Sequence, residues 1–130
     1  MKKELNHEMF STPIGAYSNG LSIPIGDKQL IVLTGQVAID KDGVCVAPDD
    51  VAEQAEYIFH KIEALLGEAG ADLSNIIRVV IYLTDMDDFS RVSPVRNKYL
   101  EKSRPVSTLV EVSRLTIPGC RIEIEATAIL

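Results

Sequence analysis

The sequence predicts an α+β fold in which a mixed β-sheet carries two helices on one face. Two apolar segments, residues 30–33 and 76–83, are typical of strands inside a sheet, and helical spacing of apolar residues separates them. The last quarter of the chain alternates apolar and polar residues at the period of a strand. A length of 130 residues suits one compact domain, so we expect a single domain over 1–130.

The first predicted strand lies within residues 28–39, where the unbroken apolar run indicates burial on both faces. A turn (DKDG) follows. Asp50 is a suitable N-cap for the first helix, with Glu53 completing a box-like pair, and Gly70 ends that helix. Because strand, helix and strand follow one another, we expect a right-handed crossover between parallel strands.

A short helical turn is predicted over residues 85–91, before a second helix that runs to about Lys102. Ser93 fits the N-cap of that helix and Pro94 its first helical position. The alternative is one helix with Pro94 in its interior, which would cost about 3 kcal/mol. A break and restart is therefore the predicted arrangement.

Two alternating strands close the chain, over residues 107–113 and 121–128. Their predicted apolar faces carry Thr108, Val110 and Val112, and then Ile122, Ile124, Ala126 and Ala128. The opposite, polar face carries Glu111, Glu123 and Glu125. An uncovered polar face and open sheet edges suit assembly into an oligomer.

Composition opposes several classes of function. With 19 acidic against 13 basic residues, a net charge of -6, no basic run and no tryptophan, the chain does not look like a nucleic-acid binder. Without a readable signal peptide or an apolar stretch of roughly 18 residues, the expected place is the cytoplasm, with no membrane contact. Cys45 and Cys120 allow one disulfide at most, Cys120 has no obvious activating partner, and no metal-binding pattern occurs.

The three carboxylates on the polar strand face are the first candidates for chemistry. A carboxylate acts as a general base when its surroundings tune its pKa. The alternative is a solvated face whose glutamates pair with Arg114 or Arg121. Gly35 ends the first strand and either admits close approach of a ligand or only makes a turn. Tyr17 either contacts a ligand or lies on a surface loop.

Five segments, in this order along the chain, resemble those of one known family. They are 14–18 (IGAYS), 33–36 (LTGQ), 79–89 (VVIYLTDMDDF), 105–115 (PVSTLVEVSRL) and 122–126 (IEIEA). The family is the Rid family, the reactive-intermediate (enamine/imine) deaminases, also called YjgF-like. The resemblance extends from about residue 10 to the C-terminus.

This resemblance implies a chorismate-mutase-like fold and a homotrimer that binds a small-molecule ligand in clefts between subunits. It also implies hydrolysis of a reactive enamine or imine to a carbonyl compound and ammonia, without a metal or another cofactor. By the same resemblance, Glu123 is the catalytic residue that positions the attacking water. Tyr17 and Gly35 then border the cleft.

Three other cleft positions differ from the family pattern. Ser107 stands where one branch has an arginine that grips the substrate carboxylate, and a bidentate arginine is a strong carboxylate ligand. Leu109 stands where that branch often has cysteine, and Ser93 where asparagine is common. Arg96 or Arg104 either replaces the lost arginine or lies in solvent.

These differences leave two further functions open. One is a non-catalytic metabolite-binding or regulatory protein on the same fold. The other is a ribonuclease or translation inhibitor, which the acidic charge balance opposes.

Overall fold

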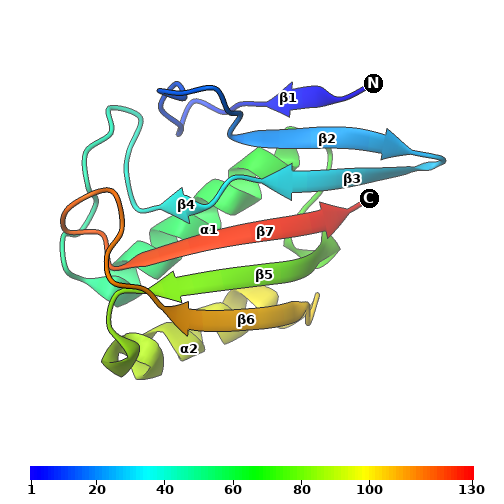
Figure 1. Ribbon diagram of the computed structural model, residues 1–130. Helices are drawn as coiled ribbons and strands as arrows, with labels where there is room; N and C mark the ends of the chain where they lie inside the picture. The colour runs from blue at the N-terminus through cyan, green and yellow to red at the C-terminus, as the bar shows by residue number, and fades with distance from the viewer.

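The computed structural model describes residues 1–130 and contains seven strands and two α-helices. The strands are β1 (Lys3–Leu5), β2 (Gly20–Ile25), β3 (Lys28–Leu33), β4 (Gln36–Val37), β5 (Ile76–Leu83), β6 (Val106–Glu111) and β7 (Ile122–Ile129). The helices are α1 (Val51–Gly67) and α2 (Phe89–Leu100), with short 3-10 turns η1 (Leu73–Asn75) and η2 (Met86–Asp88). Figure 1 shows both α-helices on one face of the sheet, as predicted.

The strands form one mixed sheet in the order β1-β2-β3-β7-β5-β6, and β4 also pairs with β7. Only β5 and β6 pair in parallel; every other pairing is antiparallel. β3 and β5 run in the same direction, as the predicted crossover requires. They are not neighbours, however, because β7 lies between them and pairs antiparallel with both. The last strand of the chain therefore occupies the middle of the sheet.

Both predicted caps of α1 are present. The Asp50 side chain accepts the backbone N–H of Glu53 at 3.2 Å. Gly70 follows the helix in a left-handed conformation, with φ +79°. The N–H groups of Gly70 and Ala71 donate to carbonyls of the last helical turn, which ends the helix as a glycine there should.

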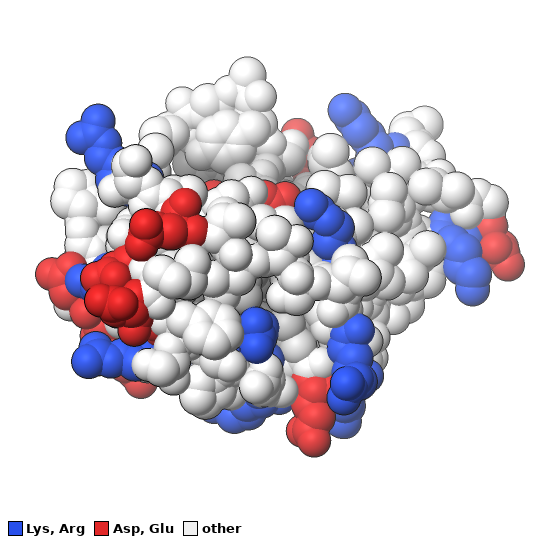
Figure 2. Space-filling view, turned by 60° about the horizontal axis from the view of Figure 1, so that its bottom comes forward, with Lys and Arg blue, Asp and Glu red and all other residues white.

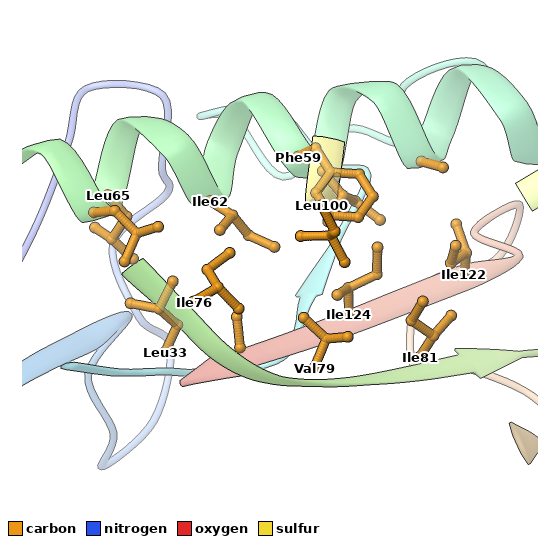
Figure 3. Close-up of a cluster of buried hydrophobic side chains, with 14 of the residues drawn as sticks. Leu33, Phe59, Ile62, Leu65, Ile76, Val79, Ile81, Leu100, Ile122 and Ile124 are labelled. Carbon is orange, nitrogen blue, oxygen red and sulfur yellow. The ribbon is translucent and has the colours of Figure 1, made fainter. Parts of the chain in front are cut away.

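The hydrophobic core lies between the sheet and the helices (Figure 3). Phe59, Ile62 and Leu65 point from α1 towards the sheet, where strand residues such as Ile81 and Ile124 meet them. All five side chains have no exposed surface. Burying side chains of this size contributes about 1.5–3 kcal/mol each, so this packing holds α1 across the middle of the sheet.

The predicted break before Pro94 is wrong, because α2 is continuous from Phe89 to Leu100 with Pro94 inside it. Pro94 lies on the exposed side of the helix, while Val92 and Val95 pack into the core. Pro94 has no N–H to donate to the carbonyl of Ser90, four residues earlier, and Ser90 is itself an exposed residue. Burial of the opposite side outweighs the cost of the proline.

The predicted burial of the first strand on both faces is also wrong. In β3, Ile31 and Leu33 are buried, but Val32 between them is 38% exposed. The reason is that both helices cover the same face of the sheet, so the other face of β3 remains open. An apolar run in the sequence therefore does not distinguish a strand covered on both faces from one with an exposed apolar residue.

The predicted faces of β6 are reversed. Leu109 pairs with Ile81 and packs against the core, whereas Val110 points to the open face and is 39% exposed. Glu111 lies opposite Leu83, on the helix side, and accepts the N–H of Met86 at 2.9 Å. The open face therefore carries two of the three predicted carboxylates, Glu123 and Glu125.

Neither helix combines the length and apolar character needed to cross a bilayer.

Candidate active site

A pocket of about 500 Å³ lies between the N-terminal segment, the end of β4 and the start of β7. It brings together three of the predicted site residues, Tyr17, Gly35 and Glu123. Its remaining walls come from the Phe10–Thr12 segment, the loop after β4 and the residues before β7. The pocket thus joins segments that are far apart in the sequence around one end of the central strand.

Glu123 is the carboxylate of this pocket. It lies on β7 opposite Val37 of β4 and is half-buried. Burial, followed by the charge of nearby Glu125, raises the pKa of Glu123. A carboxylate with a raised pKa takes a proton more readily than an ordinary glutamate, as a general base must.

The two glutamates of the open face have different partners. Glu125 accepts the hydroxyl of Tyr82 at 2.5 Å and lies 3.8 Å from the guanidinium of Arg78. Glu123 receives no hydrogen bond from the protein that would lower its pKa. Its oxygens are therefore available to a water molecule or a ligand in the pocket.

Gly35 leaves the space that the Glu123 carboxylate occupies. A Cβ atom at position 35 would overlap Glu123 Oε2 and stand 3.0 Å from Cδ. The strand end needs glycine here for this close approach rather than for an unusual backbone angle. The close approach predicted at Gly35 is therefore made by the protein's own glutamate.

We expect Gly35→Ala to displace the Glu123 carboxylate while leaving the fold intact, because the group that must move is the end of a flexible side chain. The rate of any reaction that depends on Glu123 should fall about tenfold or more, as for other small misplacements of a catalytic group. Kinetics and thermal unfolding measured on the same preparation separate the two effects. Gly67→Ala is the matched control, because Gly67 lies on α1 and a Cβ atom there meets open space. Gly43 does not serve as a control, since its φ of +79° disfavours any side chain.

Lys61 is a pocket residue that the sequence interpretation missed. Its side chain extends from α1 and is 2% exposed. Nζ donates to the carbonyls of Val37 at 3.3 Å and Ile39 at 3.1 Å, and lies 4.8 Å from the centroid of the Phe10 ring. Burial lowers the pKa of Lys61 to about 8.

A signal for Lys61 was present in the sequence. Lys61 follows Ile58 by three residues and precedes Leu65 by four, which places it on the apolar face of α1. No carboxylate lies within 4.0 Å of its ammonium group. A lysine at a buried helix position without a counter-charge is uncommon and indicates a functional or structural demand for that charge.

The other predicted residues lie elsewhere on the same chain. Arg96, Arg104 and Ser107 border a separate hollow of about 460 Å³ between α2 and β6. Leu109 is directed towards the core, and Ser93 accepts a hydrogen bond from Arg96 at 3.3 Å on the surface of α2. Neither Leu109 nor Ser93 borders this hollow or the pocket that contains Glu123. One chain therefore carries two groups of predicted site residues, apart from one another.

The chemistry open to the pocket is that of a carboxylate with a raised pKa, a tyrosine hydroxyl and a buried ammonium group. Together these groups suit proton transfer to and from a small polar ligand. No group of three or more His, Cys, Asp or Glu side chains lies close enough together to hold a metal ion.

Comparison with known proteins relates this geometry to a family. Residues 9–130 match the family described as Endoribonuclease L-PSP. A RutC family protein from Pyrococcus abyssi is 36% identical over 127 residues, covering 98% of this chain and 96% of the relative. The 2-iminobutanoate/2-iminopropanoate deaminase of Mus musculus is 29% identical over 129 residues, covering 99% and 92%.

Solved structures agree with the sequence relatives. A protein of unknown function of the conserved Rid protein family from Yersinia pestis superposes with a TM-score of 0.86 at 27% identity, covering 98% of both chains. The match in sequence and the match in fold both extend over nearly the whole chain. The chain belongs to the Rid family, whose sequence description is Endoribonuclease L-PSP.

Proposed function

We propose that this protein hydrolyses a small reactive imine or enamine to a carbonyl compound and ammonia, with Glu123 as the catalytic residue. The observation that carries the proposal is the half-buried Glu123 carboxylate, whose pKa is raised and which accepts no protein hydrogen bond in a pocket of about 500 Å³. The name of the mouse relative, an iminobutanoate and iminopropanoate deaminase, supports this class of substrate.

The proposed reaction needs one water molecule and no cofactor. Glu123 accepts a proton from water as the water oxygen attacks the imine carbon, and returns this proton to the imine nitrogen, which gives a neutral carbinolamine. The carboxylate then takes the proton of the carbinolamine hydroxyl and passes it to nitrogen. The C–N bond breaks, ammonia leaves and the carbonyl forms. Tyr17, which is 51% exposed at the pocket rim, is placed to cover the ligand.

We also propose that the complete site forms between subunits of a homotrimer. Within one chain, the pocket with Glu123 and the hollow with Arg96, Arg104 and Ser107 are separate. The open sheet face exposes Val32, Val106 and Val110, at 38%, 69% and 39%, which favours burial of this face against another copy. Light scattering should report three times the chain mass of 14.3 kDa; a stable monomer would contradict this arrangement.

The substrate class depends on which cation replaces the arginine lost at Ser107. Arg96 and Arg104 both border the hollow that contains Ser107, so we propose that they bind the carboxylate of an imino acid. Arg104 has a left-handed backbone conformation, with φ +46°, just after α2. This conformation turns the chain from α2 back towards β6 and places Arg104 at the rim of the hollow.

The test is a turnover assay on freshly generated imines. An amino-acid oxidase supplies the imine, and semicarbazide traps whatever survives. We expect the protein to lower semicarbazone formation from carboxylate-bearing imines. In an Arg96→Ala/Arg104→Ala variant, kcat/KM for these imines should fall at least about tenfold, while a neutral amine-derived imine is unaffected.

Either alternative outcome changes the interpretation. Turnover of only the neutral imine would mean that Ser107 marks a change of substrate and that the two arginines have no role. Saturable binding of metabolites without turnover of any imine would support the non-catalytic function, which the changes at Ser93, Ser107 and Leu109 favour.

Ribonuclease activity has less support, although it appears in the family description. On the face in Figure 2, Lys and Arg side chains form separate patches with acidic groups among them, rather than a continuous basic surface. The net charge of -6 also opposes binding to a phosphate backbone. RNA cleavage that follows the protein through purification and is lost in a pocket variant would overturn this view.

A further inference from the structure

Two free cysteines that are far apart in the sequence lie side by side, in two loops whose other residues border the pocket. Cys45 belongs to the loop after β4, and Cys120 lies in the turn before β7. Their sulfur atoms are 3.6 Å apart. A disulfide bond is about 2.0 Å long, so the two sulfurs need to approach by only about 1.6 Å.

The two loops are already held together by one buried side chain. Gln54 of α1, which has no exposed surface, donates to the carbonyls of Ala47 at 3.1 Å and Gly119 at 2.7 Å. Its Oε1 accepts the N–H of Arg121 at 2.8 Å. Because these bonds hold the two loops beside one another, the entropic cost of closing a covalent link between Cys45 and Cys120 is small.

The two thiols differ in a way that assigns each a role. Cys45 is half-buried, whereas Cys120 is 5% exposed. Burial, followed by the hydrogen bond to Cys45, raises the pKa of Cys120 to about 12, so this thiol is protonated before Cys45 reacts. Cys120 donates its S–H to the Cys45 sulfur. Gln54 Nε2 lies 3.7 Å from the same sulfur, but its two hydrogens are directed at the carbonyls of Ala47 and Gly119. Cys45 is therefore the more accessible thiol and the acceptor of the pair, so it makes the first attack.

We propose that Cys45 and Cys120 are a redox modification site that forms an intramolecular disulfide with a small-molecule disulfide as oxidant. Cys45 attacks one sulfur of the oxidant and displaces a thiolate, which leaves a mixed disulfide on Cys45. The departing thiolate takes the proton of Cys120, whose sulfur then attacks Cys45 and releases the second thiol. The two cysteines lose two electrons and two protons, and one small disulfide becomes two thiols.

The disulfide would act on the pocket through its rim. Lys41, Asp42 and Gly43 from the loop of Cys45 line the pocket, as do Thr116 and Ile117 from the segment before Cys120. A covalent link joins these two parts of the rim and restricts their separation. Oxidation therefore reduces motion at the mouth of the pocket, whatever ligand the pocket takes.

The test uses the full chain in its native state with oxidised glutathione. Intact mass spectrometry should show the loss of two hydrogens with no glutathione attached, and a digest should yield one peptide pair joined through Cys45 and Cys120. Reduction by dithiothreitol should restore both thiols. Hydrogen exchange in residues 40–48 and 115–120 should slow in the oxidised protein.

Variants identify the order of attack. Cys120→Ser should stop at a single glutathione adduct on Cys45, and Cys45→Ser should react more slowly at Cys120. Cys120→Ala provides the same test if the serine variant does not fold. Free thiols that persist in native protein, stable glutathione adducts on the unsubstituted chain, or a disulfide between two chains would each overturn the proposal.

Discussion

Glu123→Gln is expected to lower imine hydrolysis at least about 100-fold, because the amide cannot take a proton from the attacking water. The substitution keeps the size and shape of the side chain, so the close packing against Gly35 remains. Ligand binding in the pocket should be retained, which separates a defect in the chemical step from a defect in binding. Single-turnover kinetics with the oxidase-generated imine measure the chemical step, and an unchanged rate would remove Glu123 from the mechanism.

The same variant has an expected effect on stability. Burial and Glu125 raise the pKa of Glu123 in the folded protein, so the ionised carboxylate costs stability that the protonated form does not. This cost is absent when the pH is below the pKa of Glu123 in the unfolded chain. It is fully present when the pH is above the raised pKa of Glu123 in the folded protein. Glu123→Gln should therefore unfold at higher temperature than the unsubstituted protein near neutral pH, with the difference vanishing in acid.

Glu125→Gln is the matched control on the neighbouring position of the open face. Glu125 accepts the Tyr82 hydroxyl and lies near Arg78. Replacing Glu125 therefore removes favourable contacts and does not relieve the free-energy cost of burying a charge. We expect this variant to be no more stable than the unsubstituted protein at neutral pH. A gain in stability equal to that of Glu123→Gln would show that repulsion between the two glutamates, and not burial of Glu123, is the main cost.

Local sequence patterns predicted most of the fold. The period of apolar residues located α1, β5 and β7, and the caps at Asp50 and Gly70 are local interactions that a sequence pattern can show. The position of Pro94 inside α2 and the orientation of β6 were predicted wrongly. Both depend on packing across the molecule, because burial of Val92 and Val95 outweighs the proline, and pairing of Leu109 with Ile81 decides which face of β6 meets the core.

The candidate site could be predicted only in part. Tyr17, Gly35 and Glu123 were candidates from the strand and turn patterns, the family resemblance gave them their roles, and the chain brings them to one pocket. Lys61 was missed because a lysine among apolar helix residues carries no information about the carbonyl groups that it reaches. Those carbonyls, of Val37 and Ile39, belong to a segment more than 20 residues earlier, and only the fold places them beside Nζ.

Lys61→Met provides the second large expected effect, as a dependence of stability on pH. The pKa of Lys61 is lowered from 10.5 to about 8 in the folded protein because the charged form is buried. Below pH 8 the lysine is charged in both states, so folding carries the full cost of burying that charge. Between about pH 8 and 10.5 the unfolded state binds more protons, so the unsubstituted protein gains stability relative to the variant as the pH rises.

The expected gain across this range is about 2–3 kcal/mol, since one pKa unit corresponds to 1.36 kcal/mol. Urea unfolding of both proteins in the lower and upper parts of the range measures it, with Lys28→Met as the control for loss of one exposed positive charge. Parallel stability curves would mean that the Lys61 ammonium is hydrated in solution. A gain of the expected size would establish a buried positive charge in the wall of the pocket that Glu123 lines, with no carboxylate within 4.0 Å of it.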